Sequence, residues 1–458
     1  MSPIHLNEDL NIDSVAVIGA GPCGLSAAKY LLAEKKFSRV QIFEQKATVG
    51  GVWVYSPWNS DSDGPGDDFA SPVYDFLETN IPHTLMNYSD LKFPEDSSLF
   101  PRHQVVKKYL DDYAEPLKPI LSLSTQVLSA KKIPVTGRRV WEIKTRNLQT
   151  QEISEAHFDA VLVANGHYND AFLPDIPGLN AFREAHPGSI LHSKHYRNPD
   201  HYRDKKVIVV GNSASGVDIS AQISTCAKLP VIVSEKTTPD PSAGEQASPW
   251  AKFLPEMSEF VPEDRTVRFT NGHVERNIDA VVFCTGYLYT FPFFSDLSPP
   301  VTDDGNCVLN LYQHLFYIDD RTLAFAGLPQ RIVPFPFSEG QAAWVSRVWS
   351  GRLTLPSVAE MHAWEEDVVE KTGAGKSLHT LAFPNDLEYI NMMHDISLRA
   401  DKREGLENDG VGKLPPFWDD DTRWVRQQMP LIKAASRQLG EKRHQVKTLE
   451  ELGFDHRA

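Results

Sequence analysis

Short apolar runs that end in glycine are the clearest feature in the pattern of hydrophobic and polar positions. The run Ser14–Ile18 ends at glycines, and the residues from Leu25 to Lys35 that follow have helical composition. A second apolar run, Val40–Phe43, ends at Glu44. A β-branched run followed by a glycine-rich turn is typical of a buried strand. This segment is therefore predicted to form a strand, a tight loop, a helix and a second strand.

The same order of elements returns in the middle of the chain. The apolar run Lys206–Val210 ends at Gly211, a helix-like stretch continues to Cys226, and Val231–Val233 is the next expected strand. Repetition of the pattern predicts an α/β fold with two Rossmann-type dinucleotide-binding domains. Two domains also fit a chain of 458 residues, which is too long for one ordinary core.

Other segments complete the expected architecture. Buried strands are predicted at 158–164 and 279–284, and a hairpin in 266–275 is predicted to turn at Asn271-Gly272. Beyond Gln341 the pattern is mostly helical and rich in tryptophan. This last part of the chain indicates little about chemistry by itself.

The first glycine-rich turn, Gly19-Ala-Gly21-Pro-Cys-Gly24, fits the pattern G-x-G-x-x-G between a strand and a helix. Gly19 permits the tight turn, Gly21 lets the backbone approach a pyrophosphate, and Gly24 lets helix and strand pack closely. Glu44 follows the next strand, where a carboxylate can accept hydrogen bonds from ribose hydroxyls. The pattern predicts a cradle for a dinucleotide, and a turn of the same composition without a ligand is the alternative.

The second turn repeats the cradle as Gly211-Asn-Ser213-Ala-Ser215-Gly216, with a serine in place of the second glycine. Serine still allows a close approach and can donate a hydrogen bond to phosphate. The next strand ends in three polar residues, Ser234, Glu235 and Lys236. Ser234 and Lys236 suit a 2′-phosphate, whereas Glu235 would repel one, so NADPH is favoured over NADH. A structural Rossmann unit without a ligand is the alternative.

Composition and charge narrow the class of partner. The formal net charge of −15 argues against nucleic acid and against an anionic membrane surface. No apolar run approaches the ~20 residues that span a bilayer, and the first residues lack the order of a signal peptide, so a cytoplasmic protein is expected. The four cysteines (Cys23, Cys226, Cys284 and Cys307) lie far apart, which indicates neither a zinc site nor a redox dithiol. No metal is expected.

Further motifs resemble those of one enzyme family. Gly50-Gly51-Val-Trp53 follows the first unit, and Phe283-Cys-Thr285-Gly286-Tyr287 resembles a F/L-A-T-G-Y signature. Gly188, His192 and Tyr196 have the spacing of the monooxygenase fingerprint F-x-G-x-x-x-H-x-x-x-F/Y/W. With Leu77–Asn80 and the segment from Gly327 through Gln341 to Gly351, the set resembles a flavin-containing monooxygenase, most closely the soluble yeast and fungal type. His186, Cys284 and Ser213 depart from the family pattern, but none removes a group that the chemistry needs.

This resemblance implies a division of labour between the domains. A split FAD domain would comprise 1–171 and 291–458, with an NADPH domain inserted at 172–290, as in glutathione-reductase-like folds. NADPH would reduce FAD, and O2 would add to the flavin at C4a. The hydroperoxide would transfer one oxygen to a soft nitrogen or sulfur nucleophile of a small molecule. The cofactor carries this chemistry, so the protein needs little acid–base machinery.

Family resemblance also implies roles for single residues. Asn80 matches the asparagine whose amide donates to the flavin peroxide, although asparagine commonly caps a turn instead. Gly51, Thr285 and Gly286 are expected beside the cofactors, and Trp53 is expected as a packing wall beside the flavin. Gln341 is expected near the flavin, with a solvent-facing position on a helix as the alternative. His192 and Tyr196 are expected to organise the linker between the domains.

Three other functions share parts of this pattern. A Baeyer–Villiger monooxygenase acts on ketones, but its fingerprint generally continues with Pro or Asp, where this chain has Arg197. A pyridine-nucleotide disulfide reductase needs two cysteines close in sequence, which are absent here. A flavoprotein without turnover, acting as a redox sensor, is the third. Substrate identity, nitrogen against sulfur oxygenation and a homodimeric assembly stay open.

Overall fold

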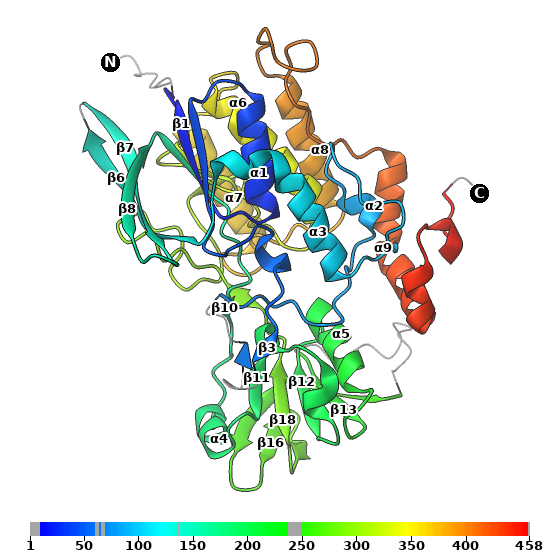
Figure 1. Cartoon of the computed structure of the whole chain (residues 1–458). Helices are drawn as coiled ribbons and strands as arrows, with labels where there is room; N and C mark the ends of the chain where they lie inside the picture. The colour runs from blue at the N-terminus through cyan, green and yellow to red at the C-terminus, as the bar shows by residue number, and fades with distance from the viewer. Residues whose placement is uncertain (1–9, 60–63, 66–68, 136, 237–248, 457–458) are drawn as a thin grey trace. The chain divides into compact units, whose positions relative to one another are not determined.

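The computed structural model describes residues 10–59, 64–65, 69–135, 137–236 and 249–456 (Figure 1). The chain divides into two compact units. The described residues of unit 1 fall within Met1–Val54, Glu78–His167 and Tyr289–Ala458, and those of unit 2 within Tyr55–Leu77 and Tyr168–Leu288. Unit 2 thus includes a segment, 55–77, that lies outside the range expected for the second domain.

Unit 1 is built on a seven-stranded sheet in the order β20-β21-β22-β9-β1-β2-β5. The pairs from β22 to β5 are parallel, whereas β20, β21 and β22 pair antiparallel. The strands are β1 (Ser14–Ile18), β2 (Arg39–Phe43), β5 (Leu121–Ser122), β9 (Ala160–Val163), β20 (Leu311–Tyr312), β21 (Phe316–Tyr317) and β22 (Leu323–Phe325). The predicted strand-loop-helix-strand unit at the start of the chain is confirmed.

Both faces of this sheet are buried, as is usual for a parallel sheet. In β1, Val15 and Val17 pack into one core, and Ala16 and Ile18 pack into another. The first core contains residues of α1 (Pro22–Ala33), α3 (His103–Ala114) and α6 (Pro334–Trp349). The second is covered by an antiparallel sheet of β6 (Thr125–Val135), β7 (Arg138–Asn147) and β8 (Ile153–Phe158).

The remaining helices of unit 1 come mostly from the end of the chain, as expected. They are α2 (His83–Met86), α7 (Val358–Thr372), α8 (Asn385–Leu398) and α9 (Asp420–Gln438). Helix α6 is buried on all sides and packs against α1 and α8. It therefore fixes the position of α1, the helix that starts at the first glycine turn (Figure 1).

Unit 2 repeats this architecture on a smaller scale. Its five-stranded sheet is parallel throughout, in the order β11-β18-β12-β13-β14. Helix α5 (Ala214–Ile223) contributes to the core on one face, and a three-stranded antiparallel sheet contributes to the core on the other. The strands are β11 (Ile190–His192), β12 (Val207–Val210), β13 (Val231–Ser234), β14 (Ala251–Leu254), β15 (Met257–Val261), β16 (Thr266–Phe269), β17 (Val274–Glu275) and β18 (Ala280–Phe283).

The predicted hairpin is also present in unit 2. Strands β16 and β17 pair antiparallel, and Gly272 between them has φ +82°, in the left-handed region that glycine favours. Helix α4 (Leu179–Ala185) and the short pair β10 (Asp170–Ala171) and β19 (Tyr287–Leu288) complete this unit. The predicted α/β class with two Rossmann-type units is confirmed.

The strand expected over 158–164 is wrong in one respect. Phe158 ends β8 in the antiparallel sheet, whereas Ala160–Val163 form β9 in the parallel sheet. Asp159 separates them, because its carboxylate accepts hydrogen bonds from the backbone N–H groups of Asp13 and Ser14 at 3.0 and 2.9 Å. One apolar run therefore belongs to two sheets.

Candidate cofactor sites

The first glycine turn has the geometry of a phosphate cradle. Gly19 has φ +107°, and a Cβ there would lie 2.4 Å from the carbonyl oxygen of Ala164. A Cβ on Gly24 would lie 1.9 Å from the carbonyl oxygen of Gly19, so helix α1 can pack against β1 only without a side chain. Gly21 is the N-cap of α1 and provides no side-chain cap. The first N–H groups of α1 are thus available to an anion.

Glu44 lies beside this turn, at the end of β2. Its carboxylate is almost fully buried and accepts backbone hydrogen bonds from Ala20 and Lys46, each at 2.8 Å. Burial raises the pKa of Glu44 above its ordinary value, and the two backbone donors act in the opposite direction. Each carboxylate oxygen has two lone pairs, so both can still accept from a ribose hydroxyl.

The Gly50-Gly51 turn lies against the first cradle. A Cβ on Gly51 would lie 2.8 Å from the Cα of Gly21, which means that the two backbones meet without an intervening side chain. Gly50 donates its N–H to the carbonyl of Ala20 at 2.9 Å. Trp53 ends the short helix η1 (Gly51–Trp53) and packs partly buried against the first core. Gly51 therefore lies on the wall of the cradle, and the position of Trp53 beside a flavin stays a prediction.

Gln341 is completely buried in α6, so the solvent-facing alternative is wrong. Its amide accepts from the N–H of Gly327 at 2.9 Å and donates to the hydroxyl of Tyr389 at 3.3 Å. A Cβ on Gly327 would lie 2.4 Å from Sγ of Cys23, in the first turn of α1. Gln341 thus holds a backbone segment against the first cradle, and both ends of its amide are occupied.

The loop that carries Asn80 is fastened on both sides of that residue. Glu78 is buried and pairs with Lys433 at 2.7 Å and with Arg443 at 2.9 Å. The Thr79 hydroxyl donates to the carbonyl of Ile81 at 2.7 Å, across Asn80. Burial raises the pKa of Glu78, but the two cations outweigh it and the net shift is downward.

Asn80 itself is exposed in this loop. Within the described part of the chain its amide makes no hydrogen bond, so the turn is bridged by Thr79 and not by Asn80. The structure shows no contact between Asn80 and the first cradle. An exposed amide on an anchored backbone can donate to a ligand at little cost in conformational entropy.

The second glycine turn has a backbone geometry similar to that of the first. Gly211 has φ +98°, and a Cβ there would lie 2.7 Å from the carbonyl oxygen of Cys284. A Cβ on Gly216 would lie 1.8 Å from the carbonyl oxygen of Gly211. Ser213 is the N-cap of α5, and no side chain caps that helix. Ser213 and Ser215 are both exposed.

The other residues expected at the second cradle fall into different surroundings. Ser234 is buried, and its hydroxyl donates to the carbonyl of Pro255 at 2.9 Å. The Lys236 ammonium is exposed and lies 3.9 Å from the carboxylate of Glu256. Thr285 follows Cys284 and donates its hydroxyl to the carbonyl of Phe172. The cradle is thus formed by the turn itself, and these side chains are already engaged.

Two of the fingerprint residues, His192 and Tyr196, are buried in unit 2 and organise its backbone. His192 donates from Nε2 to the carbonyl of Gly286 at 3.1 Å and accepts from the N–H of Lys194 at Nδ1. Burial lowers the pKa of His192 to about 4, so it is neutral at pH 7. Tyr196 donates to Oε1 of Gln222 at 3.0 Å. Neither side chain has a geometry that suggests direct chemistry.

Arg197 has a structural role that its sequence position did not reveal. Its guanidinium is 1% exposed and donates to four backbone carbonyls, those of Ser56, Ser71, Lys194 and Tyr196. It therefore fastens both ends of the segment 56–71 to the fingerprint. Because one guanidinium joins segments far apart in sequence, only the tertiary structure could assign this role.

A group of buried histidines in unit 1 was also not expected. Nδ1 of His314 lies 3.1 Å from Nδ1 of His379, and the ring of Tyr289 lies between His379 and His167 with centroid distances of 5.4 and 5.2 Å. Burial lowers the pKa of His167 and of His314 to about 4, and that of His379 further. These histidines are neutral at pH 7.

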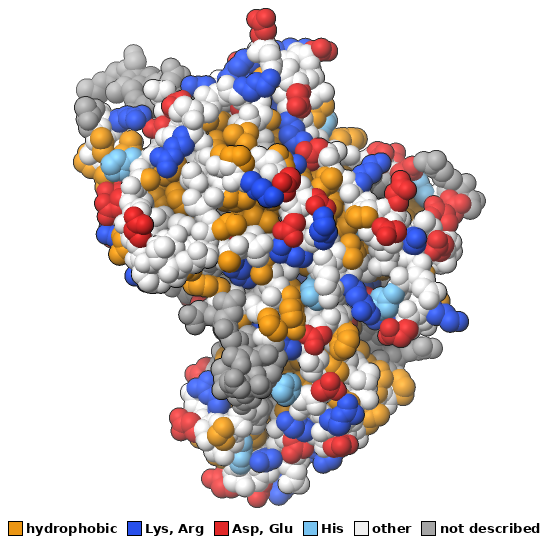
Figure 2. Space-filling view, viewed as in Figure 1, with side chains coloured by type: hydrophobic (Ala, Val, Ile, Leu, Met, Phe, Trp, Pro, Cys, Tyr) orange, Lys and Arg blue, Asp and Glu red, His pale blue; other side chains and the backbone are white. Residues whose placement is uncertain are grey.

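Several observations limit other kinds of site. Among the described residues no group of three or more His, Cys, Asp or Glu could hold a metal ion. All four cysteines are free, and burial raises the pKa of Cys23 to about 12, which keeps its thiol protonated. In the part of the chain that the structure describes, no helix is long and apolar enough to cross a membrane. Acidic and basic side chains are interspersed on the visible surface (Figure 2).

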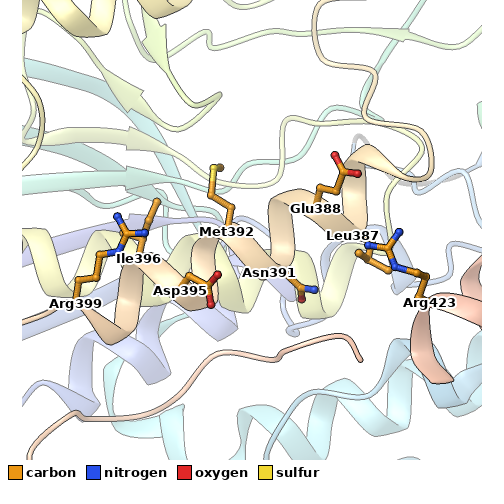
Figure 3. A pocket seen from close by; sticks show the side chains of 8 residues that line it. All are labelled: Leu387, Glu388, Asn391, Met392, Asp395, Ile396, Arg399 and Arg423. Atoms are coloured by element: carbon orange, nitrogen blue, oxygen red, sulfur yellow. The ribbon is translucent and has the colours of Figure 1, made fainter. Parts of the chain in front are cut away.

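One pocket lies apart from the cradle residues. It has a volume of about 470 Å³ and is lined by α8 side chains such as Asp395, by Arg399 just after α8 and by Arg423 from α9 (Figure 3). None of the residues expected to bind a cofactor lines it. Its mixed charges and its position on the α8 surface set it apart from the two cradles.

The fold has two glycine turns of the dinucleotide-binding type, and comparison with known proteins gives the family. The model of the family described as flavin-binding monooxygenase-like matches residues 12–239 and 252–406. The chain is 38% identical over 368 residues to the flavin-containing monooxygenase FMO GS-OX5 of Arabidopsis thaliana, which covers 77% of both chains. The chain therefore belongs to the flavin-containing monooxygenases, and the enzyme class predicted from the motifs is confirmed.

Two solved structures resemble it along most of their length. S-allyl-L-cysteine S-oxygenase from Allium sativum has a TM-score of 0.77 and 27% identity, with 96% of each chain covered. Tmm from Pelagibacter sp. strain HTCC7211 has a TM-score of 0.74 and 25% identity, and the match covers 92% of this chain and 90% of that one. Both support the assignment of the two-unit fold.

Proposed function

We propose that this enzyme uses FAD, a reduced nicotinamide nucleotide and O2 to transfer one oxygen atom to a sulfur or nitrogen atom of a small molecule. The observation that carries the proposal is the pair of glycine turns with the same tight backbone, each at the start of a helix without a side-chain cap. Sulfur is supported by the similar S-oxygenase from Allium sativum. Nitrogen is supported by the motif resemblance alone.

FAD is assigned to unit 1. The turn at Gly21 and Gly51 would receive the pyrophosphate, because two glycine backbones meet there without an intervening side chain. Glu44 would accept from the adenosine ribose. Gln341 would act through Gly327 as a positioning residue for the same cradle. These roles fit the geometry, since a Cβ at Gly51 would close the gap between the two turns.

The nicotinamide nucleotide is assigned to unit 2, and its expected domain is 172–290. Ser213 and Ser215 would donate to its phosphates, since their hydroxyls are exposed beside the uncapped start of α5. Thr285 and Gly286 would line the turn from the neighbouring strand. The family resemblance implies NADPH as the hydride donor.

Bound flavin, once reduced, supplies the electrons that activate O2. The chain must then keep water out and hold the reactive oxygen, and Asn80 is assigned to the second task. A neutral amide donates a hydrogen bond without transferring its proton. It can therefore stabilise a basic oxygen without protonating that oxygen and causing its early release. Thr79 and the Glu78 ion pairs hold the Asn80 backbone in place for this role.

The test compares wild type with Asn80→Ala under 18O2. Wild type is expected to place one labelled oxygen on a sulfur probe, S-allyl-L-cysteine, or on a nitrogen probe, trimethylamine. Asn80→Ala should bind FAD normally and still consume nucleotide, but release hydrogen peroxide in place of product. Loss of one donor in a dry site corresponds to about 2–4 kcal/mol, or roughly 30- to 1,000-fold in coupled turnover.

Asn180→Ala is the matched control, because Asn180 is exposed in α4 and accepts only from Arg183 of the same helix. It should behave as wild type. If Asn80→Ala oxygenates the probe with unchanged coupling, the assignment of Asn80 is wrong. If wild type labels neither class of probe, the proposed reaction is wrong.

A further inference from the structure

The residue that follows β13 occupies the same place as the residue that follows β2. Ile18 pairs with Phe43 in unit 1, and Val210 pairs with Ser234 in unit 2. Glu44 and Glu235 are the next residues in the two units. Glu235 is therefore the counterpart of Glu44 in the second cradle.

Main-chain hydrogen bonds confirm that the two positions correspond. Gly19 donates to the carbonyl of Phe43 at 2.8 Å, and Gly211 donates to that of Ser234 at 2.7 Å. The N–H of Glu235 donates to Leu254 at 3.1 Å, and that of Glu44 donates to Ser122 at 2.9 Å. In each unit the acid is bonded to the next parallel strand and adjoins the first glycine of the cradle.

A carboxylate at this position recognises an unmodified ribose. In Rossmann units an acid about 20 residues after the glycine turn accepts hydrogen bonds from the ribose hydroxyls of NAD, whereas a cationic side chain accommodates the 2′-phosphate of NADP. A 2′-phosphate adds nearly two negative charges and would face the carboxylate directly. The position of Glu235 thus favours a free 2′-hydroxyl.

The two residues expected to favour NADPH do not offset this carboxylate. Ser234 is 1% exposed and its hydroxyl is bonded to Pro255, so it faces the interior and not a ligand. Lys236 lies 3.9 Å from Glu256, a second carboxylate. Among the described residues near the end of β13, the single ammonium of Lys236 therefore lies with the two carboxylates of Glu235 and Glu256.

We propose that Glu235 holds the 2′,3′-diol of NADH, and that this enzyme binds NADH at least as tightly as NADPH. The inference rests on the proposed function, in which the second cradle holds a nicotinamide nucleotide. It revises the NADPH preference that the family resemblance implies. Glu235 is the specificity-determining residue, and Lys236 contributes little.

The test measures equilibrium binding of NAD+ and NADP+ to the oxidised, FAD-loaded enzyme by titration calorimetry. Wild type is expected to bind NAD+ at least as tightly as NADP+. Glu235→Gln should weaken NAD+ binding roughly 10- to 100-fold, because it removes charge-assisted hydrogen bonds to the diol. NADP+ binding should stay the same or strengthen. Anaerobic reduction of the flavin by NADH and by NADPH gives a second readout.

Glu256→Gln is the matched control, since it removes a neighbouring carboxylate that does not occupy the ribose position. Its NAD+ affinity should stay within about twofold of wild type, and FAD content and circular dichroism check that both variants fold. If wild type binds NADP+ at least tenfold more tightly than NAD+, and Glu235→Gln changes neither affinity, the inference is wrong but the proposed function still holds. Failure of both nucleotides to bind and to reduce the flavin overturns the proposed function instead.

Discussion

The two glycine turns of this enzyme share one backbone and differ in what surrounds it. In each, the third glycine would place a Cβ within 2 Å of the carbonyl oxygen of the first, at 1.9 Å for Gly24 and 1.8 Å for Gly216. The first glycine of each is left-handed, with φ +107° at Gly19 and +98° at Gly211. These requirements come from the fold and are independent of any ligand.

The middle position is where the two turns differ. Gly21 and Ser213 have φ −76° and −96°, which any residue can adopt. Gly21 faces the backbone of Gly51, whereas Ser213 is exposed. A Cβ on Gly21 would lie 3.5 Å from the Cα of Gly51, which is an ordinary contact, so the facing turn alone does not exclude a side chain there. The proposed pyrophosphate would exclude one at Gly21, whereas the second cradle already carries the Ser213 side chain. The departure of Ser213 from the family pattern is therefore compatible with an intact cradle.

The largest effect is expected from Gly24→Ala and Gly216→Ala. Alanine normally stabilises a helix relative to glycine by up to about 1 kcal/mol, but here its Cβ would collide with a carbonyl oxygen. Each change should lower the free energy of unfolding by roughly 3 kcal/mol or more, measured by urea denaturation. Gly24→Ala should also release FAD, whereas Gly216→Ala should retain it.

Gly375→Ala is the control, because a Cβ there meets nothing within 4 Å. It should change the free energy of unfolding by less than about 0.5 kcal/mol. Equal loss of FAD in the Gly24 and Gly216 variants would show that the two cradles do not serve separate ligands.

Substitutions at the middle position of each turn, Gly21 and Ser213, should affect ligand binding with a smaller effect on folding. Gly21→Val should abolish FAD binding, because a β-branched side chain would occupy the space for the pyrophosphate beside Gly51. Ser213→Val should keep FAD and lose affinity for the nicotinamide nucleotide. Flavin absorbance and nucleotide titration check the two results, with thermal unfolding as the control. A colourless Ser213→Val protein would contradict the assignment of ligands to units.

The last comparison concerns acid, to which unit 1 should be more sensitive than unit 2. Unit 1 has buried histidines with lowered pKa at His167, His314 and His379, whereas unit 2 has His192. Unfolded histidine binds protons below pH 6.5, whereas folded His167, His314 and His192 have a pKa of about 4. Burial also holds the pKa of His379 well below its ordinary value. The contribution of each neutral buried histidine to the free energy of unfolding is therefore fully present above pH 6.5. This contribution decreases as the pH falls to about 4, by about 1–3 kcal/mol per histidine.

Urea unfolding at pH 7.5 and 5.0, with FAD fluorescence as the probe of unit 1, measures this difference. His314→Asn should make the stability less dependent on pH, and His157→Asn should not, because His157 is exposed. A stability of unit 1 that does not change between these pH values would rule out the histidine contribution.

The sequence was sufficient to predict local features of this molecule. The strands β1, β2, β12 and β13, the two turns and the hairpin at Gly272 follow from apolar runs and glycines that act within a few residues. The three-stranded sheet β6-β7-β8 was not predicted, because its long strands have mixed polarity and are half-buried. Asp159 likewise divided one apolar run between two sheets.

Roles that depend on distant partners were not accessible from the sequence. Ser234 suits a phosphate by residue type, but its hydroxyl is bonded to Pro255 inside the unit. Arg197 was considered only as a departure from another fingerprint, and the structure shows it bonded to carbonyls more than a hundred residues away. The roles of Ser234 and Arg197 both depend on where their side chains point. The alternation of residues in a strand predicts side-chain direction only within that strand.

The ion pairs of Glu78 connect the Asn80 loop to the end of the chain. Glu78 is separated from Lys433 by 355 residues and from Arg443 by 365. At a synthesis rate of about 5–20 residues per second, the loop leaves the ribosome roughly 20–70 s before these cations exist. The residues that complete the first cradle, up to Gln341 of α6, also precede these cations in the chain. A nascent chain can therefore complete the cradle before it can fasten the Asn80 loop. If Asn80 holds the reactive oxygen as proposed, the chain can fix that group in place only when its synthesis is nearly complete.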